Sequence, residues 1–265
     1  MKVNVGDNSY YVEVTGKGEP VIMFHGFTGS LRTWDLLVNY LSEHFQCITV
    51  DLPGHGQTNA DVTDMEQACR ELKQIIQEVT TETFNLLGYS MGGRTALVFA
   101  HQYPESVKRL ILESASPGLD GDEKNNRQLR DEKLATYIEE NGIEEFVNYW
   151  ETIPLFQTQE SLPDSVKQEI RRERLSQTES GLALSLRTMG TGVQLSMWQH
   201  LNNLNLPVFL ISGELDRKFV NLNQQMDDEF PTAIHTTVSN VGHAIHLENP
   251  DFFGKIVMKH LNNYI

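Results

Sequence analysis

Cysteine is nearly absent from this sequence, with only Cys47 and Cys69 among 265 residues. Neither has a partner at a metal-ligand spacing, so we expect both to be buried free thiols. No run of about 18 apolar residues is present that could span a bilayer. Residues 1–7 also lack the continuous apolar core and the small-residue cleavage site of a signal peptide. We therefore expect a cytoplasmic protein.

Positive charge is scarce as well, because 21 Lys and Arg face 36 Asp and Glu and leave a formal net charge of −15. Nucleic acid and anionic membrane both require a positive surface, so neither is expected as a partner. The glycine-rich phosphate loops of nucleotide-binding enzymes are missing too. We expect no organic cofactor, no metal, and a monomer or weak homo-oligomer. An anionic substrate would need a local positive pocket.

Short apolar runs alternate with helical patterns along most of the chain, which is typical of a mostly parallel sheet with helices on both faces. Runs such as Val21-Ile22-Met23-Phe24 are apolar on both faces, as in strands covered from both sides. The strands are predicted at residues 10–14, 21–24, 47–50, 84–87, 110–112, 208–211 and 234–238. The helices between and after them are predicted at residues 33–41, 65–78, 91–102, 222–230 and 252–261.

The alternation stops between residues 118 and 198, where no strand-like run occurs. This stretch predicts several amphipathic helices, at residues 128–140, 143–150, 165–175 and 182–189. We interpret it as a helical cap inserted before the last two strands, with residues 1–117 and 199–265 forming the core. Such a cap would cover the carboxyl edge of the sheet, where open α/β sheets bind ligands.

The run Gly88-Tyr89-Ser90-Met91-Gly92 fits the G-x-S-x-G nucleophile elbow. It follows a predicted strand and precedes a predicted helix, which is the context that this motif requires. The glycines allow a tight turn, and the serine hydroxyl then lies at a helix N-terminus, where backbone N–H groups favour negative charge. We predict Ser90 as the central catalytic residue.

A second loop can supply the oxyanion hole. His25-Gly26-Phe27-Thr28-Gly29 follows the strand at 21–24, so the backbone N–H groups of Phe27 and Met91 are the expected donors. His25 is interpreted as an anchor of this loop rather than a proton shuttle. The turn Asp51-Leu52-Pro53-Gly54-His55-Gly56 is interpreted as structural, with its Asp and His fixing the turn.

The acid and the base should follow the serine in that order. Asp216 comes after the strand at 208–211, and His243 comes after the strand at 234–238, so both can reach Ser90. His243 would accept the serine proton, and Asp216 would fix its tautomer. Glu214 is an alternative to Asp216, and His246 is an alternative to His243.

Arg94 lies one helical turn after Ser90, so the two side chains can share a helix face. A guanidinium there suits a carboxylate bound by two hydrogen bonds, and a general esterase has no need of it. Other arginines gather in the predicted cap: Arg127, Arg130, Arg171, Arg172, Arg174 and Arg187. Those that point inward would provide the positive pocket that the net charge makes necessary.

Together these motifs resemble the α/β-hydrolase-fold 2-succinyl-6-hydroxy-2,4-cyclohexadiene-1-carboxylate synthases (MenH family) of menaquinone biosynthesis. The similarity spans nearly the whole chain; its more specific parts are Gly-Gly-Arg94, the Ser116-Pro117-Gly118-Leu119 segment, and residues 189–198. It implies a lyase that removes pyruvate from a polycarboxylated cyclohexene, with Ser90 as the base. By position, it implies substrate binding by Tyr89, Arg94, Arg127, Trp150 and Arg174, with Arg172 as a rival to Arg174.

Two other functions remain open from the sequence. A serine hydrolase of the same fold, either a carboxylesterase or a carbon–carbon bond hydrolase, would share the triad and the cap. A non-catalytic binding protein would share only the fold, and the intact set of Ser90, Asp216 and His243 disfavours it.

Overall fold

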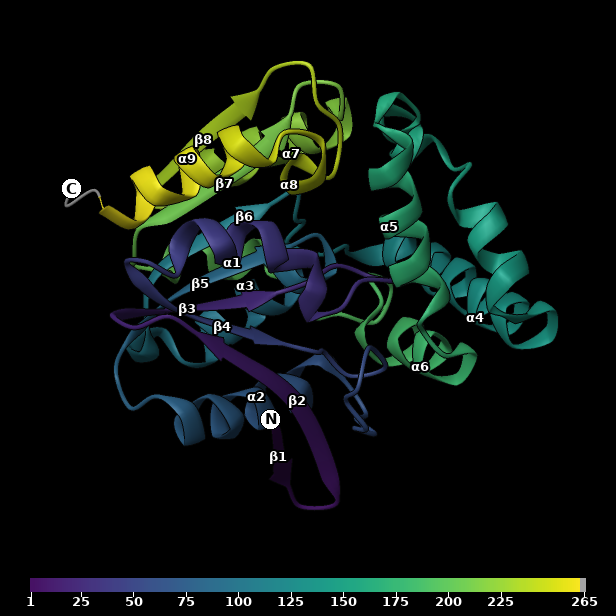
Figure 1. The fold of residues 1–265 in the computed structure, drawn as a ribbon, viewed down its shortest axis with the longest axis horizontal. Helices are drawn as coiled ribbons and strands as arrows, with labels where there is room; N and C mark the ends of the chain where they lie inside the picture. Colours follow the sequence, from purple (N-terminus) through teal and green to yellow (C-terminus); the bar gives the residue numbers. More distant parts are fainter. Residues whose placement is uncertain (263–265) are drawn as a thin grey trace.

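A single eight-stranded sheet organises the computed structural model, which describes residues 1–262. The strand order is β1-β2-β4-β3-β5-β6-β7-β8 (Figure 1). The strands are β1 (Lys2–Val5), β2 (Asn8–Thr15), β3 (Glu19–Phe24), β4 (Phe45–Val50), β5 (Phe84–Tyr89), β6 (Val107–Glu113), β7 (Val208–Gly213) and β8 (Ala233–Val238). β1 and β2 pair antiparallel with their neighbours, and β4, β3 and β5 to β8 are parallel.

Helices cover both faces of this sheet, which explains why residues 21–24 of β3 are apolar on both faces. On one face, α1 (Asp35–Leu41) and α9 (Pro250–Asn262) pack on strand residues such as Val21 and Met23. On the other face, α2 (Met65–Val79), α3 (Met91–Gln102) and α7 (Arg217–Glu229) pack on the alternate residues, among them Ile22 and Phe24. Parallel strands need such crossover helices, and their carboxyl ends therefore meet at one edge.

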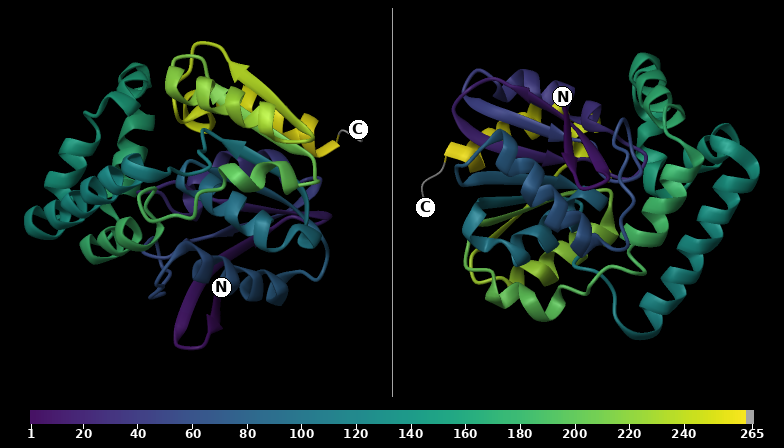
Figure 2. Two further views of the ribbon diagram at one scale, coloured as in Figure 1. Left: turned by 180° about the vertical axis from the view of Figure 1, so that it is seen from behind. Right: turned by 90° about the horizontal axis from the view of Figure 1, so that it is seen from below.

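The segment between β6 and β7 carries α4 (Gly121–Trp150), α5 (Asp164–Leu175) and α6 (Glu179–Met189). These helices form a separate layer beside the sheet in all three views (Figures 1 and 2). α4 consists of two helical halves that meet at Gly142. The φ of this residue is 82°, a value that glycine adopts without strain because it has no Cβ. The cap helices share a small apolar core of their own, centred on Phe146 and Leu182.

The predicted α/β-hydrolase architecture is confirmed, and each predicted strand is present with slightly wider limits. The prediction missed β1, a short edge strand of alternating burial. α4 begins seven residues earlier than expected, at Gly121, and α7 begins at Arg217 rather than at residue 222. The domain limits at residues 118 and 198 stay a prediction. Both cysteines are free and buried, and none of the helices within residues 1–262 could cross a membrane.

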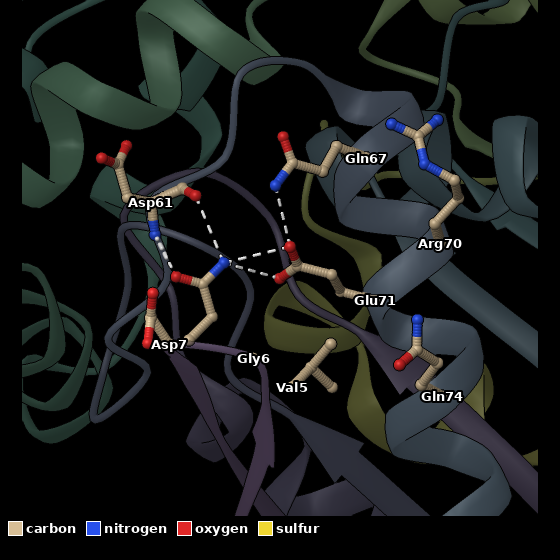
Figure 3. Close-up of a pocket in the computed structure, with 9 residues that line it drawn as sticks. Val5, Gly6, Asp7, Asp61, Gln67, Arg70, Glu71 and Gln74 are labelled. Atoms are coloured by element: carbon tan, nitrogen blue, oxygen red, sulfur yellow. Dashed lines mark hydrogen bonds between the residues drawn. The ribbon is translucent and has the colours of Figure 1, made fainter.

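A shallow pocket lies where the β1–β2 hairpin meets α2 (Figure 3). Its buried Glu71 carboxylate accepts hydrogen bonds from Asn8 Nδ2, Tyr10 Oη and Gln67 Nε2 at 2.8–3.0 Å. The carboxylate is thus satisfied by protein donors, and Asn8 Oδ1 in turn accepts from the Asp61 backbone N–H. We interpret this network as a structural tie that fastens the hairpin to α2.

Candidate active site

Ser90 occupies a sharp turn between β5 and α3. Its φ of 51° is unusual for a residue with a Cβ, and its N–H donates to Glu113 O at 2.9 Å, which fixes the turn to β6. A Cβ on Gly88 would approach Gly92 O to 2.3 Å, and one on Gly92 would approach Phe24 O to 2.1 Å. Only glycine fits these two positions, so the motif is required by the close packing of the turn.

His243 and Asp216 are hydrogen-bonded in a chain that ends at Ser90. His243 Nε2 lies 3.0 Å from Ser90 Oγ, and His243 Nδ1 lies 2.7 Å from Asp216 Oδ2. The His243 side chain is 2% exposed and that of Asp216 is 8% exposed, so water competes little with either bond. The Asp216 carboxylate accepts a hydrogen bond from His243 Nδ1–H. This bond fixes the tautomer of His243 in which Nε2 can take a proton.

The two alternatives to Asp216 and His243, which are Glu214 and His246, do not take part in this hydrogen-bonded chain. Glu214 Oε2 accepts from the Asn240 backbone N–H at 3.1 Å and supports the loop. His246 is the second residue of α8 (Ile245–Glu248), where its Nδ1 and backbone N–H both donate to the buried Glu113 carboxylate at 2.9–3.0 Å. Its ring packs on Tyr89 with centroids 4.5 Å apart, so His246 supports the floor of the site.

Two backbone N–H groups are free to serve as an oxyanion hole beside Ser90. Met91 is the first residue of α3, where a helical N–H has no partner within the helix. In the other loop, Thr28 N donates to His55 Nε2 and Gly29 N donates to Gly26 O. None of the hydrogen bonds found among residues 1–262 uses the Phe27 N–H. Phe27 and Met91 both line the cleft at Ser90.

Neutral histidines hold this loop in place. His25 Nδ1 lies 2.8 Å from Gly26 O and its Nε2 accepts from Leu52 N at 3.0 Å. His55 Nδ1 lies 3.1 Å from Pro53 O and its Nε2 accepts from Thr28 N at 3.3 Å. In both rings one nitrogen donates and the other accepts, which only the neutral form allows. Burial lowers the pKa of His25 to about 4 and that of His55 to about 3.

The cleft above Ser90 encloses about 1050 Å³ between the sheet edge and the cap. Four of the predicted substrate-binding residues line it, namely Tyr89, Arg94, Arg127 and Trp150. Its charged lining is dominated by cations, Arg94, Arg127, Arg130, Lys133 and Lys218, against the acids Glu123 and Asp131. A chain of net charge −15 therefore presents a positive cleft.

Arg94 is the most buried of these cations, at 8% exposure. Its Nη1 donates to Met189 O and to Gln194 Oε1, both at 2.8 Å, and both acceptors are uncharged. Burial, followed by the neighbouring charge of Arg127, lowers the pKa of Arg94 to about 9, so the guanidinium stays charged near neutral pH. Arg127, in contrast, is paired with Asp131 at 2.7 Å.

Arg174 lies behind the cleft wall and is not among the residues that line it. It is buried, its guanidinium lies 4.7 Å from the centre of the Phe156 ring, and its Nη2 donates to Gln159 Oε1 at 3.0 Å. Glu151 lies 3.5 Å from Arg174 Nη1. Arg172 is exposed, so of the two rivals only Arg174 faces inward.

The cap is fastened to the core next to Arg174. Glu173 Oε1 accepts from Ser30 N at 2.9 Å, from Ser30 Oγ at 2.7 Å and from Thr33 Oγ1 at 3.1 Å. Burial raises the pKa of Glu173. Neither this contact nor the packing of Phe156 and Phe219 beside His243 is predictable from the sequence, because residues that are distant in sequence form them.

Comparisons with known proteins agree with this geometry. Residues 19–250 match the family described as alpha/beta hydrolase fold. A Bacillus subtilis protein, whose name provisionally assigns it to the 2-succinyl-6-hydroxy-2,4-cyclohexadiene-1-carboxylate synthases, is 40% identical over 99% of this chain and 98% of its own. The synthase of that name from Salmonella enteritidis is 31% identical over 88% of this chain and 90% of its own.

Among solved structures, MenH from S. aureus superposes with a TM-score of 0.91 at 34% identity, covering 95% of this chain and 97% of that one. The chain belongs to the α/β-hydrolase-fold family and, within it, to the 2-succinyl-6-hydroxy-2,4-cyclohexadiene-1-carboxylate synthases.

Proposed function

We propose that this protein is a lyase that eliminates pyruvate from a polycarboxylated cyclohexene and so forms 2-succinyl-6-hydroxy-2,4-cyclohexadiene-1-carboxylate, a step of menaquinone biosynthesis. The names of its relatives support this reaction. The observation that carries it is Arg94, a buried guanidinium one turn from Ser90 whose hydrogen bonds reach only uncharged acceptors. Such a group can form charge-assisted hydrogen bonds with an anionic ligand, which a neutral ester does not provide.

Ser90 acts as the base in this proposal. His243 Nε2, 3.0 Å away, draws the hydroxyl proton, and Ser90 Oγ takes a proton from the ring carbon next to the succinyl carbonyl. Asp216 stabilises the imidazolium that forms. The hydrogen-bonded chain of these residues supports the assignment, because a base must lie within hydrogen-bond reach of the group that it activates.

The electrons of the broken C–H bond move into the succinyl carbonyl and form an enolate. The backbone N–H groups of Phe27 and Met91 would bind the enolate oxygen, as an oxyanion hole binds any oxygen that gains negative charge. When the enolate re-forms the carbonyl, its electrons move through the ring double bond, so that a conjugated ring diene forms as the ring C–O bond to the enolpyruvyl group breaks. The leaving enolate takes up a proton and becomes pyruvate, so the step needs no oxidant and no metal.

The cations and aromatic residues of the cleft would orient the substrate. Arg94 and Arg127 face the cleft and would bind two of its carboxylates. Tyr89 and Trp150 also line the cleft, and Trp150 Nε1 is a buried donor without a hydrogen-bond partner among residues 1–262. Arg174 would reach the substrate only from behind Phe156, so we place it in a supporting position.

A spectrophotometric assay tests the proposal. The purified protein is given the enolpyruvyl precursor, and the diene product is followed by its absorbance while released pyruvate is measured with a coupled dehydrogenase. We expect equal amounts of diene and pyruvate, and negligible hydrolysis of nitrophenyl acetate. Faster turnover of the neutral ester than of the precursor would instead support the carboxylesterase alternative.

A further inference from the structure

The acceptors that hold Arg94 come from the end of α6 and the segment that follows it. Met189 O and Gln194 Oε1 both accept from the same nitrogen, Nη1, at 2.8 Å. The nearby acid Asp131 is already engaged, because its Oδ1 lies 2.7 Å from Arg127 Nε and its Oδ2 accepts from Gly192 N at 3.2 Å. Arg94 is therefore fixed in position, and none of the groups that fix it carries a charge.

Gln194 is itself buried, with 1% of its surface exposed. The orientation of its amide is set by chemistry, since a guanidinium has only donors and must face the amide oxygen. Its Nε2 then has no hydrogen-bond partner among residues 1–262 and lies near Gly118, which lines the cleft. A buried amide with an unused donor costs free energy.

A glutamate at position 194 would suit the buried Arg94 guanidinium better than the glutamine does. It has the same shape, it would pair with the buried Arg94 cation, and it would leave no N–H group unsatisfied. Stability alone therefore favours the carboxylate, because a buried charge without a partner is destabilising. The amide differs from it in one functional respect: it leaves the positive charge of Arg94 available to a ligand.

We propose that Gln194 is a positioning residue, which together with the Met189 carbonyl holds Arg94 toward the cleft without neutralising it. A substrate carboxylate then meets a guanidinium that is oriented in advance and keeps its full charge. This inference rests on the proposed function. It adds that Gln194, a residue outside the cleft lining, helps to determine the affinity for the carboxylated substrate.

Gln194→Glu tests the inference with two readouts that should move in opposite directions. The new ion pair should raise the melting temperature, and it should raise KM for the enolpyruvyl precursor by about ten- to a hundred-fold, the range of one charge-assisted contact. kcat should change less than KM. Gln194→Met, which removes the acceptor, should lower both the melting temperature and kcat/KM.

Gln177→Glu is the matched control, because Gln177 is another buried cap glutamine whose Oε1 accepts a hydrogen bond, here from Gly56 N at 3.0 Å. It should lower the melting temperature and leave KM within about twofold, far below the effect of a charge-assisted contact. In an Arg94→Ala background, Gln194→Glu should no longer raise KM, since the pair acts through Arg94.

An unchanged KM in Gln194→Glu, or an equal rise of KM in the Arg94→Ala background, would overturn the role of Gln194. A fall in the melting temperature of Gln194→Glu would overturn the claim that Arg94 lacks a compensating charge. If the wild-type protein released no pyruvate, the proposed function would fail, and the melting temperatures would still decide the claim about Arg94.

Discussion

Acid should weaken this protein through the two histidines that hold the oxyanion loop. An unfolded chain binds protons on histidine with a pKa of about 6.5, whereas burial holds the pKa of His25 at about 4 and that of His55 at about 3. Between these values the unfolded state binds more protons, so stability falls as pH falls. The stabilisation from the neutral rings is complete above the pKa of about 6.5 that histidine has in the unfolded chain. It is lost as the pH falls from there toward the pKa values of the folded protein.

The size of the effect follows from these shifts. Each histidine should cost unfolding free energy with a slope that starts at half a proton at pH 6.5 and approaches one proton below it, which amounts to roughly 1–2 kcal/mol between pH 6.5 and 5. The physical reason is visible in the hydrogen bonds, because a proton on Nε2 would face the N–H of Leu52 or of Thr28. Protonation thus removes the acceptor that holds the loop carrying Phe27.

Urea unfolding at several pH values measures this slope. His55→Gln lacks the titrating ring. The slope of its unfolding free energy against pH should therefore be smaller than that of the wild type by about one bound proton. Val12→Ala is the control, since a cavity at this buried valine lowers stability at every pH and leaves the slope unchanged. If His55→Gln kept the wild-type slope, His55 would not be the neutral anchor inferred here. The protection factor of the Thr28 amide against hydrogen exchange should also fall in acid.

Three further predictions concern catalysis and the cap. Ser90→Ala should abolish pyruvate release with an unchanged melting temperature, and mass spectrometry of the working wild-type enzyme should find no acyl group on Ser90; a trapped acyl-enzyme would indicate a hydrolase. Arg94→Lys should lose nearly as much kcat/KM as Arg94→Ala, about ten- to a hundred-fold, because lysine lacks the planar fork that binds a carboxylate; full activity of the lysine variant would show that only charge matters. Glu173→Ala should cost about 1–3 kcal/mol in urea unfolding, since it removes the acceptor of the Ser30 and Thr33 hydroxyls and leaves the Ser30 N–H only the longer contact, 3.4 Å, with Thr33 Oγ1. It should also raise KM by moving the adjacent Arg174, and an unchanged unfolding midpoint would contradict the fastening role of Glu173.

The sequence was sufficient to predict the core of the fold and the residues around Ser90. Apolar runs buried on both faces are recognisable without a structure, and so is the glycine pattern that a tight turn demands. Asp216 and His243 could be located because parallel strands end at one edge, which brings the residues after β7 and β8 to the residue after β5.

What could not be predicted depends on contacts between distant segments. β1 is too short and too polar to be recognised, and it is held by pairing with β2. The inward face of α5 became clear only from its packing, which buries Arg174 and exposes Arg172. Gln194 and Glu113 gave no local signal, because their roles lie in partners 100 and 133 residues away.

The triad alone does not determine which reaction occurs, because a serine activated by histidine can attack a carbonyl or remove a proton. The choice depends on which atom of the substrate is held next to Ser90 Oγ. In this cleft, Arg94 and Arg127 would fix the carboxylates before chemistry begins, and a positively lined cleft in a chain of charge −15 would favour substrates that carry them. With the carboxylates bound, a C–H bond next to a carbonyl can be presented to the serine, while that carbonyl oxygen occupies the hole at Phe27 and Met91. Elimination then follows from substrate orientation, and the same triad without these guanidinium groups would be left with the chemistry of an esterase.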